Sequence, residues 1–459
     1  MTSVSPQSLG RRLGPFDAAA IVVSNVIGGG ILFTPPLIAA MVPSAWLFLS
    51  TWLAGGLLAF AGAMAYAELG ALRPRAGGEY VYLRDAYGRL LGFLTGWTSF
   101  IAGFSGAMAG SAVVIPFYLD RFVPGAANAT PFLAIPIVPG FVVLSFSAQT
   151  MVALAAVWGL AWIHLRGVGP GRIVGNVLAV LKVAAFVLFI ALGFAVGQGD
   201  VANLAQSAPV VPANWLLALI PVMFTFSGWN AAAYVAEEIR EPGHNVPRAL
   251  ALGTGAVIAI YLLLNTLYLY VLPATELAAV RGSVLDVIAD RLLGAAAGNV
   301  MGVVGLVSLL ASISAMTFAG PRVYFAMARD GLFFRATGRV HPRYGTPAVA
   351  IVAQAAWTSI LVLSATAGAL TTYTGFAITL FTGIAVLALF ILRRREPNAE
   401  RPFSTWGYPV APAIYVVSAA AIVLNGLYSA PAATGWGAAI ILAGVPLYLV
   451  FASKATKSV

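Results

Sequence analysis

Long apolar segments separated by short polar connections dominate the pattern of this sequence. Each segment continues for about 20 residues, the length that an α-helix needs to cross a bilayer. The apolar positions are continuous and do not alternate with a period of two, so the pattern excludes a transmembrane β-barrel. We therefore predict an all-α integral membrane protein of about twelve transmembrane helices, covering residues 16–41, 45–71, 89–119, 147–165, 172–197, 212–239, 247–272, 296–328, 347–365, 371–392, 409–429 and 434–452.

The composition agrees with this interpretation. Of the 459 residues, 60% are hydrophobic and 9% are charged, which is more apolar than a soluble core requires. Arg11 and Arg12 precede a long span and not a short apolar core with a cleavage site, so we expect no cleaved signal peptide. The chain has no cysteine, which excludes disulfides, thiol nucleophiles and cysteine metal sites. We expect a single polytopic membrane domain over residues 1–459.

Lysine and arginine are distributed unevenly between the predicted connections. If the N-terminus is cytoplasmic, the outer connections hold only Arg121, Arg281 and Arg291, and one further cation, Lys182, lies inside a span. The remaining 21 of the 25 Lys and Arg residues lie on the cytoplasmic side, as the positive-inside rule requires. We therefore predict a multi-pass protein of the cell membrane with both termini in the cytoplasm. The net charge of +10 reflects this topology, and we expect no nucleic-acid partner.

The first span contains the sequence Ile27-Gly28-Gly29-Gly30-Ile31 at its centre. Each glycine costs a helix about 1 kcal/mol relative to alanine, and two prolines follow. This pattern predicts a helix that is broken at mid-membrane, with backbone groups that hydrocarbon cannot satisfy. Broken helices of this kind form the binding sites of secondary transporters. The alternative is a glycine seam for close helix packing.

A second break is predicted in the sixth span, which reads Phe224-Thr225-Phe226-Ser227-Gly228-Trp229-Asn230. Serine, glycine and asparagine are poor helix residues, and an asparagine is costly at this depth. Spans one and six occupy matching positions in two halves, a first repeat over 16–197 and a second, inverted repeat over 212–392, followed by two additional helices over 409–452. Two interrupted helices in such positions indicate a binding site at mid-membrane.

The two breaks suit a ligand that carries both an ammonium and a carboxylate group. The first half of span one ends near Ile27 with free carbonyls that suit an ammonium, and the second half begins near Gly30 with free N–H groups that suit a carboxylate. We expect substrate binding by Ile27, Gly28, Gly29, Gly30, Phe224, Thr225, Phe226, Ser227, Trp229 and Asn230. Phe226 and Trp229 are expected to shape or gate the pocket, although packing in the core is an alternative for the aromatic residues.

Lys182 is the only cation inside a predicted span. An ammonium at that depth is expensive, which indicates a functional role. It either titrates during transport or acts as a fixed tie to carbonyls of the broken first helix, and the alternative is a lysine that snorkels to a membrane face. Asp17 and Glu68 lie near span ends, so a relay of carboxylates is disfavoured. No acidic or basic side chain is expected at the breaks, and we therefore predict a neutral substrate.

The remaining chemistry-bearing residues indicate no enzyme. His164, His244 and His341 fall at the cytoplasmic edges of spans and are expected to be solvated. A Walker-type phosphate loop is absent, as is a nucleophile paired with a base, and we expect neither metal nor cofactor. A membrane receptor or sensor of amino acids is an alternative of a different class. It would normally carry an output domain, whereas about seven residues follow the last predicted span.

Several motifs together indicate a known family. They are Ile27-Gly28-Gly29-Gly30-Ile31, Gly77-Gly78-Glu79-Tyr80-Val81-Tyr82, Phe226-Ser227-Gly228-Trp229-Asn230, Glu237-Glu238-Ile239-Arg240-Glu241-Pro242 and Ala328-Arg329-Asp330-Gly331. Over nearly its whole length the chain resembles the amino acid–polyamine–organocation (APC) transporters, especially the L-amino-acid transporter (LAT) branch. The resemblance implies a five-plus-five inverted repeat of the LeuT-like type, with helices 1 and 6 broken. It also implies sodium-independent amino acid transport, often by obligatory exchange.

The resemblance also gives roles to particular residues. In similar transporters a lysine in span five takes the place of a sodium ion, and Lys182 matches that position. Ser312 and Ser314 lie where sodium-dependent relatives place hydroxyl ligands. Gly29 and Leu32 stand where the family usually has serine and phenylalanine, which leaves substrate choice open. Members that pair with a heavy subunit do so through a cysteine in an outer loop, and this chain has none, so we expect no disulfide-linked subunit.

We therefore predict a sodium-independent secondary transporter of neutral L-amino acids that works by alternating access and exchange, with Lys182 coupling the first helix to span five. The alternative within transport is a proton-coupled amino acid symporter in which Lys182 is the proton site.

Overall fold

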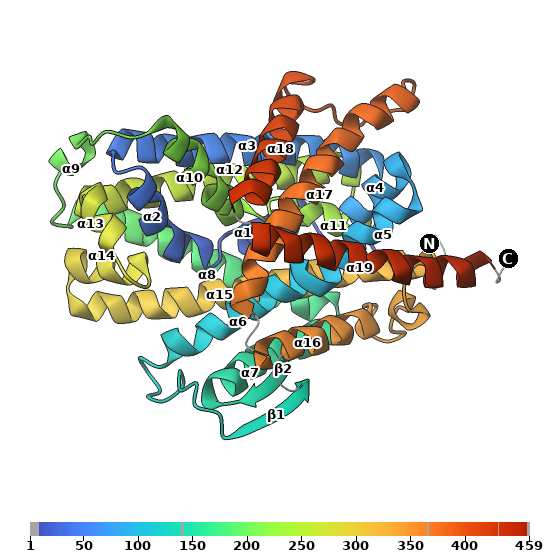
Figure 1. Cartoon of the computed structure of the whole chain (residues 1–459), viewed down its shortest axis with the longest axis horizontal. Coiled ribbons are helices and arrows are strands. Elements are labelled where there is room, and N and C mark those ends of the chain that lie inside the picture. The colour runs from blue at the N-terminus through green and yellow to red at the C-terminus, as the bar shows by residue number, and fades with distance from the viewer. Residues whose placement is uncertain (1–8, 139–141, 365–366, 430, 457–459) are drawn as a thin grey trace.

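The computed structural model describes residues 9–138, 142–364, 367–429 and 431–456, and it is almost entirely helical (Figure 1). The helices of the first half are α1 Pro15–Val26, α2 Gly30–Met41, α3 Ala45–Leu72, α4 Glu79–Tyr87, α5 Arg89–Thr98, the π-helix η1 Ser99–Gly103, α6 Phe104–Leu119, α7 Ala148–Leu165, α8 Val168–Ala195 and α9 Ala202–Ala205. Two strands, β1 Leu133–Val138 and β2 Val142–Phe146, precede α7.

The second half is also helical. Its elements are α10 Pro212–Phe226, α11 Ala231–Tyr234, the 3-10 helix η2 Ala236–Glu238, α12 Pro242–Val271, α13 Ala274–Ala279, α14 Val284–Leu293, α15 Ala295–Arg329, η3 Arg335–Gly338, α16 Ala348–Leu363, α17 Ala367–Arg395, α18 Val410–Ser429 and α19 Pro431–Thr456.

The helices confirm an all-α fold of the membrane type. Within the described residues, nine helices are long and apolar enough to cross a membrane, and the bent pair of α1 and α2 makes a tenth span. The other two predicted spans correspond to the shorter apolar helices α10 and α16. The exact count of twelve and the inverted repeat stay predictions.

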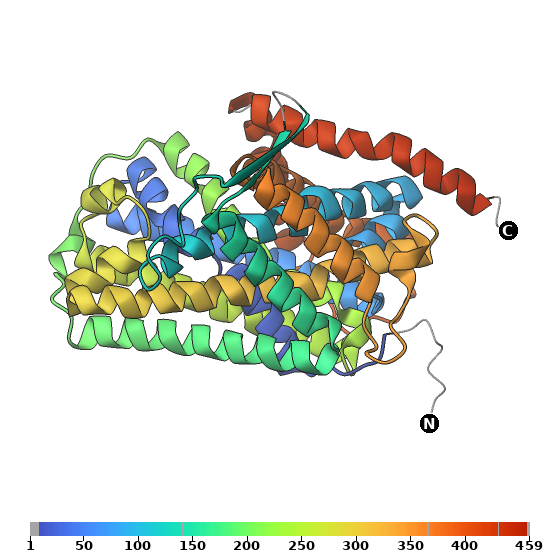
Figure 2. The ribbon, with the colours of Figure 1, turned by 90° about the horizontal axis from the view of Figure 1, so that it is seen from below.

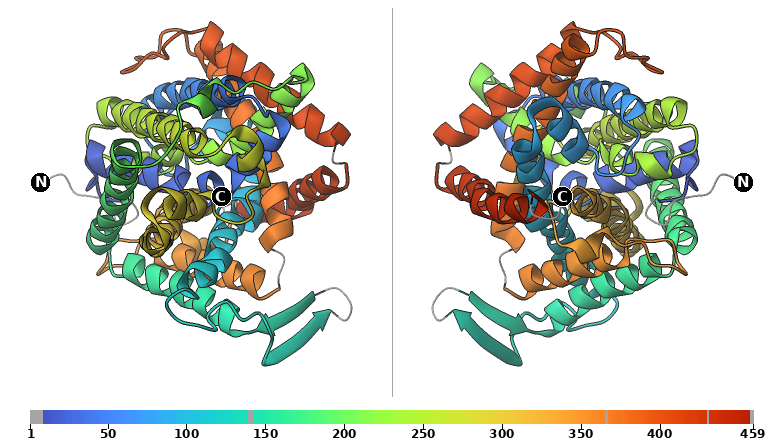
Figure 3. Two further views of the ribbon diagram at one scale, coloured as in Figure 1. Left: turned by 90° about the vertical axis from the view of Figure 1, so that its left-hand side faces the viewer. Right: turned by 90° about the vertical axis from the view of Figure 1, so that its right-hand side faces the viewer.

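Helices α8 and α15 run along the long axis of the molecule and lie side by side in two views at right angles, whereas α17 and α18 are tilted away from this axis (Figures 1 and 2). We call the end with α9, α13 and α14 the outer end, and the end where α4 lies and α19 terminates the inner end, following the orientation predicted from the sequence. Seen along the axis, the helices form a bundle from which the β1–β2 hairpin projects (Figure 3).

The first break lies where the three glycines predicted it. Helix α1 ends at Val26, Ile27 has an extended backbone with φ −75° and ψ 91°, and α2 begins at Gly30. The two helices meet at an angle of 47°. A polar cap fixes the start of α1, because Asp17 Oδ2 accepts a hydrogen bond of 2.7 Å from the N–H of Gly14. The prediction of a helix interrupted at its centre is confirmed.

The second break separates α10 from α11 at residues 227–230. Gly228 has φ +100°, a conformation that side chains rarely adopt. A Cβ atom there would also lie 2.6 Å from Nδ2 of Asn25, which is a residue of α1. Asn25 Nδ2 donates a hydrogen bond of 3.3 Å to the Gly228 carbonyl. Glycine is therefore required at this position both for the turn and for the contact between the two broken helices.

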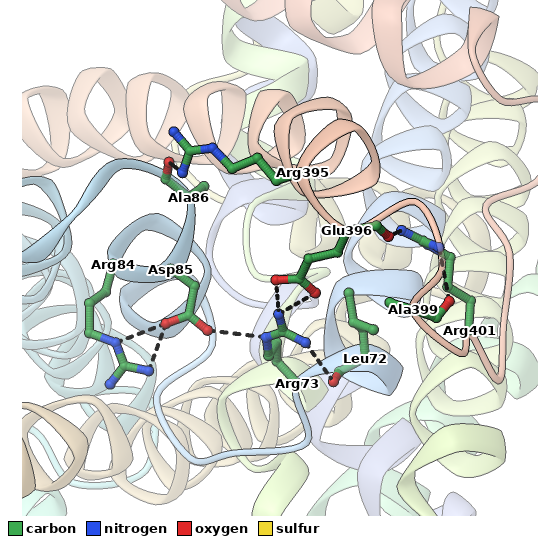
Figure 4. A network of polar contacts seen from close by, with 9 residues as sticks. All are labelled: Leu72, Arg73, Arg84, Asp85, Ala86, Arg395, Glu396, Ala399 and Arg401. Atoms are coloured by element: carbon green, nitrogen blue, oxygen red, sulfur yellow. Dashed lines mark hydrogen bonds and ion pairs between the residues drawn. The ribbon is translucent and has the colours of Figure 1, made fainter.

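Ion pairs at the inner end fix the loop helix α4 to its neighbours (Figure 4). Asp85 lies 3.1 Å from Arg73 Nε at the end of α3 and 2.8 Å from Arg84 Nη2. Arg73 also pairs with Glu396, directly after α17, at 2.5 Å. Arg395 donates to the carbonyl of Ala86 at 2.8 Å. These contacts attach α4 to the ends of both α3 and α17.

The segment before α1 packs against η2. A parallel bridge joins Leu13 to Ile239, and the Glu238 carbonyl accepts hydrogen bonds from the N–H groups of Arg12 and Leu13 at 2.8 and 2.9 Å. The Glu238 side chain pairs with Arg322 of α15 at 2.7 Å, and these side chains are 0% and 1% exposed. These contacts join the segment before α1, the helix η2 and the helix α15 to one another at the inner end.

The connection after α6 forms an antiparallel hairpin. Leu133 pairs with Phe146 and Pro136 with Val143, and the register is irregular between Pro136 and Val138. Its apolar side chains face outward: Phe132 is 70% exposed and Ile137 56%.

Candidate substrate site

Lys182 joins α8 to the end of the broken helix α1. Its side chain is 0% exposed, so the alternative of a lysine that snorkels to the membrane face is wrong. The ammonium Nζ donates to the carbonyl oxygens of Ser24, at 3.2 Å, and of Ile27. These are carbonyls that the end of α1 leaves without helical partners. The lysine therefore provides the donors that the missing turn of helix would have supplied.

Tyr261 of α12 joins the two breaks to each other. Its hydroxyl oxygen lies 3.0 Å from the carbonyl oxygen of Val26 and 3.2 Å from that of Thr225. A hydroxyl has one proton, so it donates to one carbonyl at a time. The ring packs against Phe226, with a centroid distance of 5.0 Å. Sequence reasoning missed this residue, because one tyrosine in an apolar span carries no signal of its own.

The carbonyls of Ile27 and Thr225, which were expected to bind the ammonium group of a ligand, already accept hydrogen bonds from the protein. The sequence analysis assigned free carbonyls near Ile27 and Thr225 to the ammonium group of a ligand. In the structure Lys182 and Ser308 donate to the Ile27 carbonyl, the latter at 3.4 Å, and Tyr261 donates to that of Thr225. The Ile27 carbonyl thus has a protein donor for each of its two lone pairs, whereas the Thr225 carbonyl has one donor and a second lone pair.

The glycines of the first break lie against α10 and α15. A Cβ atom at Gly30 would lie 3.0 Å from Cγ2 of Thr225, and one at Gly28 would lie 3.2 Å from Oγ of Ser312. The N–H groups of Gly28 and Gly29 form no hydrogen bond within the part of the chain that the structure describes. These two amides are free donors at the start of α2, where a carboxylate is favoured.

A cavity of about 90 Å³ lies beside the second break. Polar side chains from four parts of the chain meet there, together with several apolar ones. Its lining includes Asn25, Glu79, Thr98, Ser99, Ser227, Asn230, Tyr234, Phe104, Met316 and Phe381. A smaller cavity of about 20 Å³ lies across the same break, next to Phe224, Trp229, Thr382 and Tyr415.

The aromatic residues of the second break are divided between cavity and core. Trp229 lines the smaller cavity and packs edge-on against Tyr66 and Tyr415, with centroid distances of 4.9 and 5.8 Å. Phe224 lines the same cavity. Phe226 is fully buried and packs against Trp52 and Tyr261. Trp229 and Phe224 are thus positioned next to open space, whereas Phe226 supports the tyrosine that joins the breaks.

Glu79 is an acidic residue at the second break that the sequence analysis did not expect there. Its Oε1 accepts hydrogen bonds from Asn230 Nδ2 at 2.5 Å and from Tyr234 Oη at 3.0 Å. The expectation that no acidic or basic side chain lies at the breaks is therefore wrong. Glu79 is the first residue of the loop helix α4, outside the membrane-spanning helices, and burial raises the pKa of its carboxyl above the ordinary value.

The signal for Glu79 was present in the two glycines before it. Gly77 and Gly78 have φ +111° and +49°, which turns the chain so that α4 begins facing the bundle. A Cβ atom at Gly78 would lie 2.6 Å from the Tyr234 ring. The glycines therefore bring the backbone up to α11, and the next side chain, Glu79, reaches Asn230.

The position of His164 also differs from the expectation. It was expected to be solvated, but its side chain is 3% exposed, and Nε2 lies 2.9 Å from Oγ of Ser314. Ser314 thus has a partner within the protein, while Ser312 lies next to Gly28. The two serines do not face the same space.

Replacing Tyr261 with phenylalanine removes the hydroxyl that joins the breaks and keeps the ring. We expect the KM for transport to rise about tenfold, because a buried carbonyl left without its donor costs about 1–3 kcal/mol. The measurement is uptake of labelled substrate by proteoliposomes. Tyr268→Phe on the same helix is the control, because the Tyr268 hydroxyl is buried without a partner in the described residues. An equal rise in both variants would contradict the assigned role.

The fold and this arrangement define the class of protein. Membrane-length helices, one of which is broken around a buried lysine, next to a polar cavity at a second broken helix, are the architecture of a secondary transporter. The chain belongs to the amino acid permease family, whose model, described as Amino acid permease, matches residues 13–453. This confirms the resemblance to the APC transporters and indicates a multi-pass membrane transporter of amino acids, not an enzyme.

Curated relatives carry names of the same kind. The chain is 28% identical over 442 residues to the serine/threonine exchanger SteT of Bacillus subtilis, covering 96% of each chain. It is 28% identical over 452 residues to the Asc-type amino acid transporter 1 of Mus musculus, covering 96% of this chain and 81% of the relative. It is also 28% identical over 450 residues to the large neutral amino acids transporter small subunit 2 of Homo sapiens, again covering 96% and 81%.

Proposed function

We propose that this protein is a sodium-independent exchanger of neutral L-amino acids in the cell membrane, with both termini in the cytoplasm. The single observation that carries the proposal is the contact of the Lys182 ammonium with the carbonyls of Ser24 and Ile27. The fixed ammonium stabilises the negative carbonyl end of the broken helix, a role that a bound sodium ion would otherwise have. The names of the relatives, an exchanger among them, support exchange as the mode of transport.

The substrate is held by the two breaks together. Its carboxylate binds the free N–H groups of Gly28 and Gly29 at the start of α2, next to Ile27 and Gly30. Its side chain extends along the second break, where Ser227 and Asn230 line the larger cavity and Phe224 and Trp229 the smaller one. Thr225 and Phe226 support the site through Tyr261. Alternating access then moves the broken helices of two inverted repeats relative to the rest of the bundle.

Counterflow in proteoliposomes tests the proposal. Vesicles loaded with unlabelled L-serine are expected to take up labelled L-serine or L-alanine, and empty vesicles to take up little. Replacing external sodium with choline is expected to change nothing. Failure to exchange or accumulate any amino acid at any pH would overturn the proposal.

Proton-coupled symport is the second candidate, because Lys182 is buried without a carboxylate partner in the described residues. An inward proton gradient would then drive accumulation into empty vesicles. In the exchanger that we propose, the gradient has no effect and internal amino acid is required. We also propose that the transporter works without a disulfide-linked subunit, since the chain has no cysteine.

A further inference from the structure

Within the part of the chain that the structure describes, Glu79 is a buried carboxyl group without a cationic partner. Glu79 is 5% exposed. The side chains that donate hydrogen bonds to its carboxyl group, Asn230 and Tyr234, are neutral. Glu79 takes part in none of the ion pairs among the described residues, because the acidic side chain in each of them belongs to a residue other than Glu79. A carboxylate is costly in such surroundings unless a proton or another positive charge accompanies it.

The carboxyl group borders space that a ligand can occupy. It lines the cavity of about 90 Å³ together with Asn25, the α1 residue that contacts Gly228, and Ser227 of the second break. A substrate whose backbone is held between the breaks would extend its side chain along this wall. A positive charge at the end of that side chain would meet the one acidic group in the cavity lining.

Glu79 is also held in place. The ion pair of Asp85 with Arg73 fixes α4 to the end of α3, and the hydrogen bond from Arg395 to the Ala86 carbonyl fixes it to the end of α17 (Figure 4). Gly77 N–H donates to the Tyr234 carbonyl at 3.1 Å, directly before the helix. These contacts hold the chain in place on both sides of Glu79.

We propose that Glu79 determines the substrate class of this transporter: its carboxylate pairs with the side-chain ammonium of a cationic amino acid, and a proton takes that place when the amino acid is neutral. The inference rests on the proposed function and extends its substrate range from neutral to cationic amino acids at the same site.

The proton balance is simple. When a cationic side chain enters, the carboxylic acid of Glu79 releases its proton to water and the carboxylate pairs with the ammonium. The titratable groups that face Glu79 are the phenols of Tyr66 on α3, Tyr82 on α4, Tyr234 on α11 and Tyr415 on α18. Phenols ordinarily stay neutral below about pH 10, so Glu79 is the group among them that changes charge at lower pH.

The direction of the pH effect follows from this exchange. Because burial raises the pKa of Glu79, the carboxyl group keeps its proton to a higher pH than an exposed glutamate does. Below that pKa a cationic ligand has to displace the proton. Its affinity therefore rises by about tenfold per pH unit below the pKa and levels off above it. The affinity for a neutral amino acid does not rise with pH.

Equilibrium binding to the purified full-length protein tests the inference. The ligands are L-alanine, L-ornithine and L-lysine, measured from about pH 5 to about pH 8. We expect L-ornithine or L-lysine to bind with an affinity that rises with pH. In Glu79→Gln, which keeps the shape, we expect the cationic ligands to bind at least about tenfold more weakly relative to L-alanine than they do in the wild-type protein, and to lose their pH dependence.

Glu276→Gln is the matched control, because Glu276 lies in α13 at the outer end and its side chain is 52% exposed. It should leave all three affinities unchanged. Binding of L-alanine without any binding of the cationic ligands would overturn the inference alone. Equal binding of the cationic ligands by wild type and Glu79→Gln would also overturn it. Absence of binding and exchange for every amino acid would instead refute the proposed function. If Glu79→Gln does not fold, the pH dependence of the wild-type protein decides.

Discussion

Replacing Lys182 with methionine is expected to lower the rate of amino acid exchange by about 100-fold or more. The variant keeps the length of the side chain and removes the ammonium that bonds to the Ser24 and Ile27 carbonyls. Two hydrogen bonds from a charged donor contribute at least about 1.5 kcal/mol each, and each 1.4 kcal/mol corresponds to about tenfold. Initial rates of counterflow in proteoliposomes measure the loss.

Two comparisons make this result specific. Leu181→Ala changes the neighbouring residue of the same helix, which is 52% exposed, and should leave exchange near the wild-type rate. Stability should change little in Lys182→Met, because the cost of burying an ammonium disappears together with its hydrogen bonds. A variant that exchanges normally but no longer responds to a proton gradient would instead favour proton-coupled symport. Full activity in every assay would remove Lys182 from the mechanism.

Replacing Glu238 with glutamine is expected to destabilise the protein by about 3–5 kcal/mol. Arg322 Nε and Nη2 lie 2.7 and 3.2 Å from the two carboxylate oxygens, and both side chains are at most 1% exposed. The variant leaves the guanidinium buried without its counter-charge, next to the Phe318 ring. Chemical denaturation of the purified protein, followed by the intrinsic fluorescence of its tryptophans, measures the change.

The exposed pair of Glu276 and Arg291 supplies the contrast. Its side chains are 52% and 54% exposed, and such pairs contribute about 0–1 kcal/mol, so Glu276→Gln should have nearly wild-type stability. The double variant Glu238→Leu with Arg322→Met should recover part of the loss, because it removes both buried charges. If Glu238→Gln and Glu276→Gln were equally stable, the buried pair would not have the importance that its geometry indicates.

The breaks and the lysine could be predicted because each violates a local rule. Three adjacent glycines do not belong in a helix centre, and the α1–α2 break falls at them. A lone ammonium within an apolar span needs partners, and Lys182 has the carbonyls of α1 as its partners. Such signals are contained in a few neighbouring residues, so they can be interpreted without knowing how the rest of the chain packs.

Glu79, Tyr261 and His164 could not be placed in the same way. Hydropathy assigns depth along the chain, whereas Glu79 reaches the break from a loop helix that is fixed by contacts between residues as distant as Arg73 and Glu396. Tyr261 matters because of two backbone carbonyls that no side-chain pattern encodes. His164 was assigned to a solvated edge, and the neighbouring helix α15 covers it. Each miss concerns packing between helices that are far apart in the sequence.

The ammonium of Lys182 is covalently part of α8, and this affects how membrane voltage acts on transport. A sodium ion that crossed with its substrate would gain or lose about 2.3 kcal/mol per 100 mV of potential. A charge that stays on the protein returns with every cycle, so the exchange of one neutral amino acid for another moves no net charge. The electrical gradient then neither drives nor opposes such exchange, and the two concentration ratios alone set its direction.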